Sequence, residues 1–188
     1  MLFRESTMPE LESWESFFEV DRILDRFALQ GPMVELGCGY GTFTLSLAKR
    51  TTSTVYAVDI DPAMVDTVRR RAAAQGITNI EATVRDVSVA GFGLPEGSCD
   101  AALLFNILHC EAPAKLMRET TQLLRPGGAL AVIHWRSDIT TPRGPSADIR
   151  PTGPMVQSWA EEAGQLVLSD GPFLLPPWHY GLKFTRGE

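Results

Sequence analysis

Residues 34–41 read VELGCGYG, and after an amphipathic run residues 55–61 read VYAVDID. This stretch predicts a strand, a glycine turn, a helix and a second strand that ends in a carboxylate. Glycine has no Cβ, so it permits both the sharp turn and close contact between a ligand and the backbone. The helix presents free N–H groups to that ligand, and a carboxylate about 20 residues further on can accept hydrogen bonds from both ribose hydroxyls. The unit therefore indicates a site for an adenosine-containing cofactor.

The spacing of the glycines separates this turn from two turns that bind phosphates. The nicotinamide-dinucleotide turn has the pattern G-x-G-x-x-G. Gly37 and Gly39 fit that pattern, but Thr42 occupies its third glycine position. A P-loop is excluded because no Gly-Lys-Ser/Thr follows the turn. Glu35, just ahead of the turn, would repel a pyrophosphate and suits a cationic cofactor.

With these residues the chain resembles the class I S-adenosylmethionine-dependent methyltransferases, in which E-x-G-x-G-x-G is followed by a strand that ends in an acidic residue. The sequence RPGG at residues 125–128, before an apolar stretch, is a further hallmark of that family. The resemblance covers about residues 30–188. It implies an α/β, Rossmann-like, doubly wound sheet of seven strands in the order 3-2-1-4-5-7-6, with strand 7 antiparallel.

Short apolar runs and capped periodic segments alternate along the chain as this fold requires. The apolar runs predict strands at residues 33–36, 54–58, 80–84, 100–105, 129–134, 165–169 and 178–185. The periodic segments predict helices at residues 10–29, 41–50, 62–75 and 111–124, and within residues 153–164. The alternation favours a parallel sheet with helices on both faces.

The composition suits one compact domain. The chain has 188 residues, of which 44% are hydrophobic and 21% are charged. We expect residues 1–188 to form a single domain, in which residues 1–29 are an N-terminal helical cover. This helix either covers one face of the sheet or, in addition, roofs the cofactor site with its aromatic side. With a net charge of −6 and no basic stripe, duplex nucleic acid is not an expected partner.

The absence of certain sequence features leads to expectations about the protein's location in the cell and its metal content. No apolar run approaches the about 20 residues of a membrane span, and the N-terminus does not read as a signal peptide. The three cysteines have no C-x-x-C spacing, so we expect free buried thiols and neither a disulfide framework nor a zinc site. These features favour a cytoplasmic protein.

The family resemblance implies which residues hold S-adenosylmethionine and its product S-adenosylhomocysteine. Asp59 would bind the ribose, Asp86 would accept a bond from the adenine amino group, and Asn106 would face the methionine portion. The alternative for Asp86 is a turn or helix-cap carboxylate. The expected cofactor-binding residues are Glu35, Gly37, Cys38, Gly39, Gly41, Asp59, Ile60, Asp86, Val87 and Asn106.

The three histidines are the candidate catalytic residues. His109 follows the fourth predicted strand, His134 ends the fifth, and His179 starts the antiparallel seventh, so the topology predicts that all three converge at one rim of the sheet. Together they could include a general base. The alternatives are separate structural histidines and a metal site, which the lack of H-x-x-x-H spacing disfavours.

Residues 135–154 are the candidate substrate-side loop. A connection of about 20 residues without regular structure is uncommon in a compact domain unless it is functional or disordered. Arg136, Arg143 and Arg150 lie in it and would bind a carboxylate or phosphate of the acceptor. Tyr180 would add an aromatic wall. The alternative is a surface excursion that carries solvated arginines.

The expected activity is methyl transfer from S-adenosylmethionine to a small, anionic acceptor that the sequence does not identify. The sulfonium methyl group is already electrophilic, so the enzyme must align the acceptor and exclude water without forming a covalent intermediate. One alternative is a non-catalytic protein that binds S-adenosylmethionine or S-adenosylhomocysteine. The other is an NAD-dependent oxidoreductase, against which Thr42 and Glu35 weigh.

Overall fold

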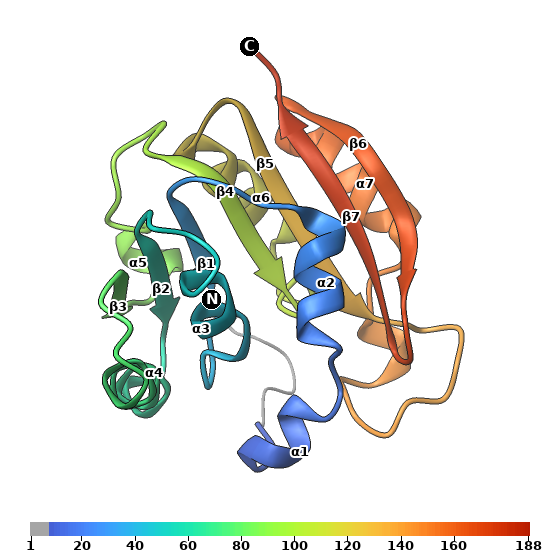
Figure 1. Ribbon diagram of the computed structural model, residues 1–188. Coiled ribbons are helices and arrows are strands. Elements are labelled where there is room, and N and C mark those ends of the chain that lie inside the picture. The colour runs from blue at the N-terminus through green and yellow to red at the C-terminus, as the bar shows by residue number, and fades with distance from the viewer. Residues whose placement is uncertain (1–7) are drawn as a thin grey trace.

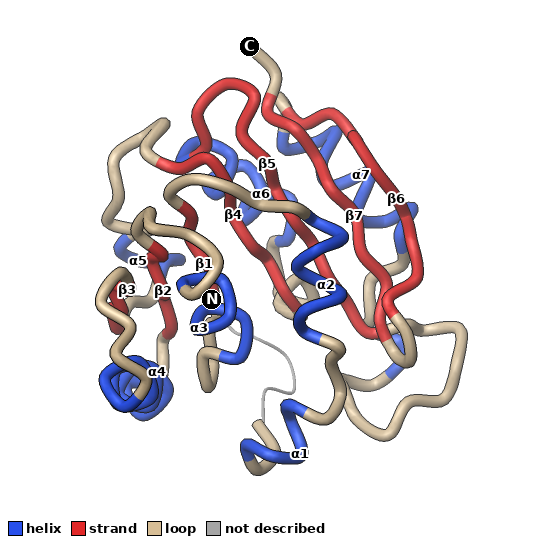
Figure 2. Tube along the Cα trace, viewed as in Figure 1, coloured by secondary structure: helices blue, strands red, loops and turns tan. Residues whose placement is uncertain are grey.

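The computed structural model describes residues 8–188 and contains one seven-stranded sheet (Figures 1 and 2). The strands are β1 (Met33–Leu36), β2 (Val55–Asp59), β3 (Ile80–Val84), β4 (Cys99–Phe105), β5 (Leu124–Trp135), β6 (Leu166–Leu175) and β7 (His179–Arg186). Their order is β3-β2-β1-β4-β5-β7-β6. Strand β7 is antiparallel to both of its neighbours, and the other pairs are parallel. The predicted Rossmann-like fold, with its strand order and antiparallel strand 7, is confirmed.

Helices cover both faces of this sheet (Figure 1). They are α1 (Leu11–Glu15), α2 (Val20–Phe27), α3 (Thr42–Ala48), α4 (Pro62–Ala74), α5 (Val87–Ala90), α6 (Pro113–Leu123) and α7 (Gly153–Ala163), with a short 3-10 helix η1 (Ala147–Ile149). Buried side chains of α2, α3 and α4 pack on one face. Those of α5, α6 and α7 pack on the other face, in the larger apolar core. The central strands are consequently buried on both sides, as parallel strands are.

The prediction of one helix over residues 10–29 is wrong, because the segment breaks into α1 and α2. Phe17 and Phe18 lie at the break, and both turn inward. Phe17 packs on Trp135 with ring centroids 5.4 Å apart, and Phe18 packs on Phe43 at 5.1 Å. Both rings are thus fixed by contacts with distant parts of the chain, at the point where the helix is interrupted.

Two strands extend further than predicted. Strand β5 begins at Leu124, which pairs with Cys99 across an irregularity in the ladder, so residues 125–128 belong to the strand and do not merely precede it. Strand β6 continues to Leu175 because its antiparallel partner β7 runs alongside. The pairing of β6 with β7 shifts register twice, between Leu168 and Asp170 and between Asp170 and Phe173. The other predicted strands and helices match the observed ones to within about three residues.

Two further expectations concern the thiols and the membrane. Cys38, Cys99 and Cys110 are buried free thiols, as predicted. Among the helices of residues 8–188, none has the length and apolar character needed to span a membrane.

Candidate active site

A cavity of about 650 Å³ lies at the carboxyl ends of the first four strands. The wall includes residues 36–40 at the end of β1, 59–61 at the end of β2, 85–87 after β3 and 105–107 at the end of β4. These segments meet because parallel strands deliver their carboxyl ends to one edge, where open α/β sheets bind ligands. Every residue predicted to bind the cofactor lines this cavity, with the exception of Gly41.

The glycine turn is held by backbone conformations that suit glycine. Gly37 has a φ of +71°, and a Cβ there would lie 2.9 Å from Cγ2 of Ile107, so a side chain would enter the cavity wall. Gly41 has a φ of +77° and caps α3. A Cβ on Gly41 would lie 2.9 Å from Cγ2 of Val68 on α4. Gly41 therefore serves the packing of α3 against α4 and lies outside the cavity lining.

Asp59 ties the second strand to the glycine turn. Its Oδ2 accepts a hydrogen bond from the backbone N–H of Gly39 at 2.8 Å, and its Oδ1 accepts from the N–H of Asp61 at 3.0 Å. The side chain is buried, and burial raises the pKa of Asp59. A carboxylate has about four lone-pair sites. Asp59 can therefore brace the turn and still accept hydrogen bonds from a diol in the cavity.

Glu35 lies beneath the turn as a buried carboxyl group that is 2% exposed. The hydroxyl of Thr44 on α3 donates a hydrogen bond to its Oε2. Burial, with a smaller contribution from the charge of Asp59, raises the pKa of Glu35 to about 8. The group is thus largely protonated at neutral pH. A cation in the cavity would favour the ionised form, in accord with the predicted preference for a cationic cofactor.

Asn106 presents two unpaired polar atoms at the end of β4. Its Oδ1 and Nδ2 are inaccessible to water and have no hydrogen-bond partner among the described residues. Its backbone is left-handed, with a φ of +57°, which asparagine tolerates better than most residues. Buried polar atoms without partners are rare. The amide therefore fits a ligand that has both a donor and an acceptor, such as the amino-acid portion of S-adenosylmethionine.

The third strand contributes Asp86 and its neighbours. Asp86 caps α5, because its Oδ1 accepts hydrogen bonds from the backbone N–H of Ser88 at 2.9 Å and from the Ser88 hydroxyl at 2.5 Å. The Ser88 hydroxyl lowers the pKa of Asp86. Asp86 thus caps a helix and also lines the cavity, and its role toward the adenine stays a prediction. Val87 and Ile60 add apolar lining, and Ile60 is exposed.

The three histidines reach one rim of the sheet as the topology predicts, but only His109 and His134 lie close together. Nδ1 of His109 lies 3.3 Å from Nε2 of His134, and only His109 lines the cavity. His179 pairs with Trp135 in the β5–β7 register, one position away from His134, so it points to the opposite face of the sheet. There its ring stacks on Phe18 at 4.6 Å, and burial lowers the pKa of His179 to about 3. Within residues 8–188, no group of side chains is arranged to hold a metal ion.

The predicted group of acceptor-binding arginines does not form. The guanidinium of Arg150 is buried and donates to the backbone oxygens of Pro145 and Arg136, both at 2.7 Å, and of Arg143 at 3.3 Å. Arg136 is paired with Asp138 at 2.7 Å. The hydroxyl of Tyr180 donates to the oxygen of Pro151 at 2.6 Å. Arg150 and Tyr180 thus hold the loop of residues 136–152 together, and neither lines the cavity. Arg143 is exposed in that loop.

Two residues of the N-terminal cover belong to the lining of the cavity. Trp14 and Met8 line the cavity from this side. Glu15 holds the cover in place, because its Oε1 lies 2.7 Å from Nη2 of Arg71 on α4. The same guanidinium donates to the oxygen of Tyr40 in the glycine turn at 2.8 Å. The signal for Arg71 was absent from the sequence, since its partners are 31 and 56 residues away.

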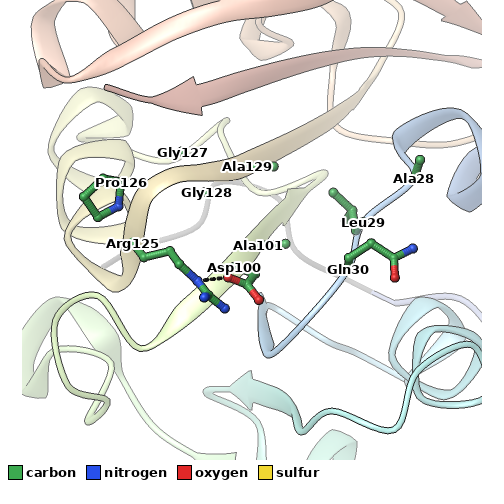
Figure 3. Close-up of a pocket in the computed structure, with 10 residues that line it drawn as sticks. All are labelled: Ala28, Leu29, Gln30, Asp100, Ala101, Arg125, Pro126, Gly127, Gly128 and Ala129. Atoms are coloured by element: carbon green, nitrogen blue, oxygen red, sulfur yellow. Dashed lines mark ion pairs between the residues drawn. The ribbon is translucent and has the colours of Figure 1, made fainter. Parts of the chain in front are cut away.

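A second, smaller cavity of about 300 Å³ lies at the amino ends of β4 and β5 (Figure 3). Residues 28–30, Asp100 and residues 125–129 line it, and Asp100 forms an ion pair with Arg125. This edge of the sheet is opposite to the one where open α/β sheets bind ligands.

Comparisons with known proteins agree with this geometry. The profile of the methyltransferase domain family matches residues 33–128, slightly more than half of the chain. An uncharacterized methyltransferase of Mycobacterium tuberculosis is 29% identical over 168 residues, which are 89% of this chain and 55% of that protein. The dimethylglycine N-methyltransferase of Parasynechococcus marenigrum is 33% identical over 99 residues, which are 52% of this chain and 35% of that protein. The chain spans between about a quarter and just over half of the length of the curated relatives it matches.

Solved structures share the fold. A SAM-dependent methyltransferase from Aquifex aeolicus matches with a TM-score of 0.82 and 21% identity, over 94% of each chain. Geranyl diphosphate C-methyltransferase from Streptomyces coelicolor, in a complex that contains S-adenosyl-L-homocysteine, matches with a TM-score of 0.73 and 15% identity, over 89% of this chain and 75% of that chain. At these identities the likeness concerns the fold alone.

Proposed function

This chain belongs to the methyltransferase domain family, and from that membership we propose that it transfers the methyl group of S-adenosylmethionine to a small acceptor molecule. The cofactor would occupy the cavity at the carboxyl ends of β1 to β4. When bound, it would supply a sulfonium methyl group that is already electrophilic. The protein would align the acceptor with that methyl group and keep water out.

The observation that carries the proposal is the arrangement of Asp59 around the glycine turn. One carboxylate braces the N–H of Gly39 and faces a cavity whose lining the glycines leave open. We propose that its remaining lone pairs accept the ribose hydroxyls of the cofactor. On the other side of the cavity, the unpaired amide of Asn106 would bind the amino-acid portion. Asp86 and Ile60 would contact the adenine.

A small acceptor is supported by the similar proteins. The names of two of them specify dimethylglycine and geranyl diphosphate as the molecules that are methylated. His109 is the histidine in the cavity lining, so we place the acceptor beside it. The expected anion site made of Arg136, Arg143 and Arg150 is not part of this proposal, because Arg150 and Arg136 are committed to partners within the loop. Arg143 is retained as an expected contact of the acceptor.

The proposal also covers organisation and location. We propose that the chain acts as a single domain, with the N-terminal segment as a cover over the cofactor and residues 135–154 beside the acceptor. A cytoplasmic location is consistent with three buried cysteines that are free thiols, because a reducing compartment keeps thiols unpaired.

A non-catalytic protein that binds S-adenosylhomocysteine is the second candidate. It is favoured by one observation, namely that Arg150 and Tyr180 of the expected acceptor side are buried in bonds to the loop backbone. An NAD-dependent oxidoreductase is not retained, because the family match and Thr42 in the third glycine position both oppose it.

Calorimetric titration with S-adenosylmethionine, S-adenosylhomocysteine and NAD tests the cofactor. We expect both sulfur compounds to bind and NAD not to bind, and we expect Asp59→Ala to weaken the binding of both. Binding of NAD without binding of S-adenosylhomocysteine would contradict the proposal. Turnover is tested separately by incubating the protein with metabolite extracts and methyl-labelled cofactor. Appearance of a labelled small product distinguishes the enzyme from the non-catalytic candidate.

A further inference from the structure

His109 and His134 form a pair of imidazoles at the wall of the cavity. Their rings are inclined at 79°, and Nδ1 of His109 faces Nε2 of His134 at 3.3 Å. His109 lines the cavity, whereas His134 lies at the end of β5 and is completely buried. A hydrogen bond between two ring nitrogens needs one donor and one acceptor, so the hydrogen positions on the two rings depend on each other.

The backbone selects the hydrogen position on His134. Nδ1 of His134 lies 3.4 Å from the carbonyl oxygen of Trp135. A carbonyl oxygen can only accept, so this contact is favourable when Nδ1 carries the hydrogen. Burial, followed by repulsion from the neighbouring His109, lowers the pKa of His134 well below its usual value, so the ring stays neutral. A neutral ring with its hydrogen on Nδ1 has its lone pair on Nε2. His134 must then accept a hydrogen bond from His109.

We propose that His134 is a positioning residue that holds His109 as its Nδ1–H tautomer, so that Nε2 of His109 is the base for an acceptor that loses a proton on methylation. This inference rests on the proposed methyl transfer. The acceptor would be a hydroxyl or a neutral amine that carries an N–H. As its heteroatom bonds to the methyl carbon, the carbon–sulfur bond breaks and sulfur keeps the electron pair. The proton moves to Nε2 of His109, and the resulting imidazolium later releases it to water.

The orientation matters because the two imidazole nitrogens lie on different edges of the ring. With Nδ1 turned toward the buried His134, Nε2 lies away from it. Neutral histidine in water prefers to carry its hydrogen on Nε2, and in that form Nε2 is a donor and cannot take up a proton. The hydrogen bond made by one ring nitrogen sets which nitrogen is protonated. His134 would therefore convert Nε2 of His109 from a donor to an acceptor.

Nitrogen-15 NMR of histidine-labelled protein tests this inference without any substrate, with the signals of His109 assigned from a His109→Gln variant. We expect wild-type His109, in its neutral form, to show a protonated Nδ1 and an unprotonated Nε2. In His134→Gln the amide oxygen can still accept from Nδ1, so the same tautomer should persist. In His134→Leu no acceptor remains, and His109 should change toward the Nε2–H form.

The matched control is His179→Leu. It also replaces a completely buried histidine at the same rim, but on the opposite face of the sheet, and should leave the tautomer of His109 unchanged. An Nε2–H tautomer in the wild-type protein would overturn the inference, as would an unchanged tautomer in His134→Leu. The wild-type spectrum decides the question even when a variant does not fold.

The methyl-transfer proposal is tested apart from this by S-adenosylhomocysteine binding. A protein that binds this compound and shows the Nε2–H tautomer would retain the proposed function and lose the inference. If the protein shows the Nδ1–H tautomer but does not bind S-adenosylhomocysteine, the hydrogen bond between the two histidines stands and the proposed role of His109 as base is lost. Once an acceptor is identified, His134→Leu should lower kcat more than it changes KM, and His134→Gln should restore much of kcat.

Discussion

At the scale of single residues, Asn106 combines a left-handed backbone with a buried amide that no described residue pairs. Both features cost stability in the protein without ligand, since an unpaired buried polar group is unfavourable by about 1–3 kcal/mol. A residue that is unfavourable for folding and lines a cavity is a candidate for binding. The amide would recover its hydrogen bonds only when a ligand is present.

Asn106→Gly separates these two contributions. Glycine keeps the positive φ without strain and removes the unpaired amide, so the midpoint of thermal unfolding without ligand should not fall. The dissociation constant for S-adenosylhomocysteine should rise by about tenfold, which corresponds to roughly 1.4 kcal/mol. Unfolding curves and titration calorimetry on the same preparations measure both. Unchanged affinity would remove Asn106 from the cofactor site.

Glu35 predicts a dependence of stability on pH. Its pKa is raised from 4.5 to about 8 because the carboxyl group is buried, so the folded state binds a proton that the unfolded state has released over this interval. Its contribution to stability is therefore complete below about pH 4.5 and is lost as the pH rises toward 8. The slope reaches about 1.4 kcal/mol per pH unit.

The variant Glu35→Gln should remove this component of the slope. Glutamine does not ionise, so the free energy of unfolding should fall less steeply between pH 5 and pH 8 than in the wild type. Denaturant titrations at intervals of about half a pH unit measure the difference between the two proteins. Parallel curves would show that Glu35 titrates at its ordinary pKa in the folded protein.

At the scale of elements, the loop of residues 136–152 is organised by one guanidinium. Arg150 is 9% exposed, and burial lowers its pKa, yet it bonds to three carbonyl oxygens of the loop. We predict that Arg150→Ala lowers the free energy of unfolding by about 2–4 kcal/mol, because the carbonyls lose a charged donor.

Arg143→Ala is the matched control in the same loop. Its side chain is exposed, so its removal should change stability by at most about 0.5 kcal/mol. Equal and small effects of both substitutions would contradict the structural role of Arg150. A large effect confined to Arg150→Ala would show that this arginine supports the loop from within and is not an acceptor-binding side chain.

The sequence predicts the elements well where their signals are local. Glycine spacing placed the turn after β1, and Asp61 followed by Pro62 placed the start of α4, where the Asp61 carboxylate accepts from the N–H of Ala63 at 2.8 Å. The break between α1 and α2 was missed because Phe17 and Phe18 contact residues far along the chain. Local periodicity contains no information on such partners.

The site, like the elements, is predictable from the sequence only where the determining signals are local or follow from the topology. Residues of the cofactor side belong to one contiguous motif and to strand ends, so sequence and topology suffice to bring them to one edge. On the acceptor side the outcome depends on side-chain direction, and the alternation of adjacent residues across a strand decides it. His134 and His179 reach the same rim but lie on opposite faces, which their separate positions in the sequence could not reveal.

At the scale of the whole molecule, the sheet order places the glycine turn, Asp59 and Asn106 around one cavity while helices enclose both faces. This placement follows from the parallel strands, whose carboxyl ends share an edge. Trp14 of the N-terminal segment also lines the cavity. The fold, the family match and the unpaired polar groups all favour this cavity as the cofactor site.

A crystal structure of the protein with S-adenosylhomocysteine tests this agreement most directly. We predict that the nucleoside lies at the carboxyl ends of β1 and β2, with both ribose hydroxyls within hydrogen-bond distance of Asp59 and the amino-acid portion against Asn106. At saturating ligand, an empty cavity, or a ligand that leaves Asp59 without contact, would contradict the account.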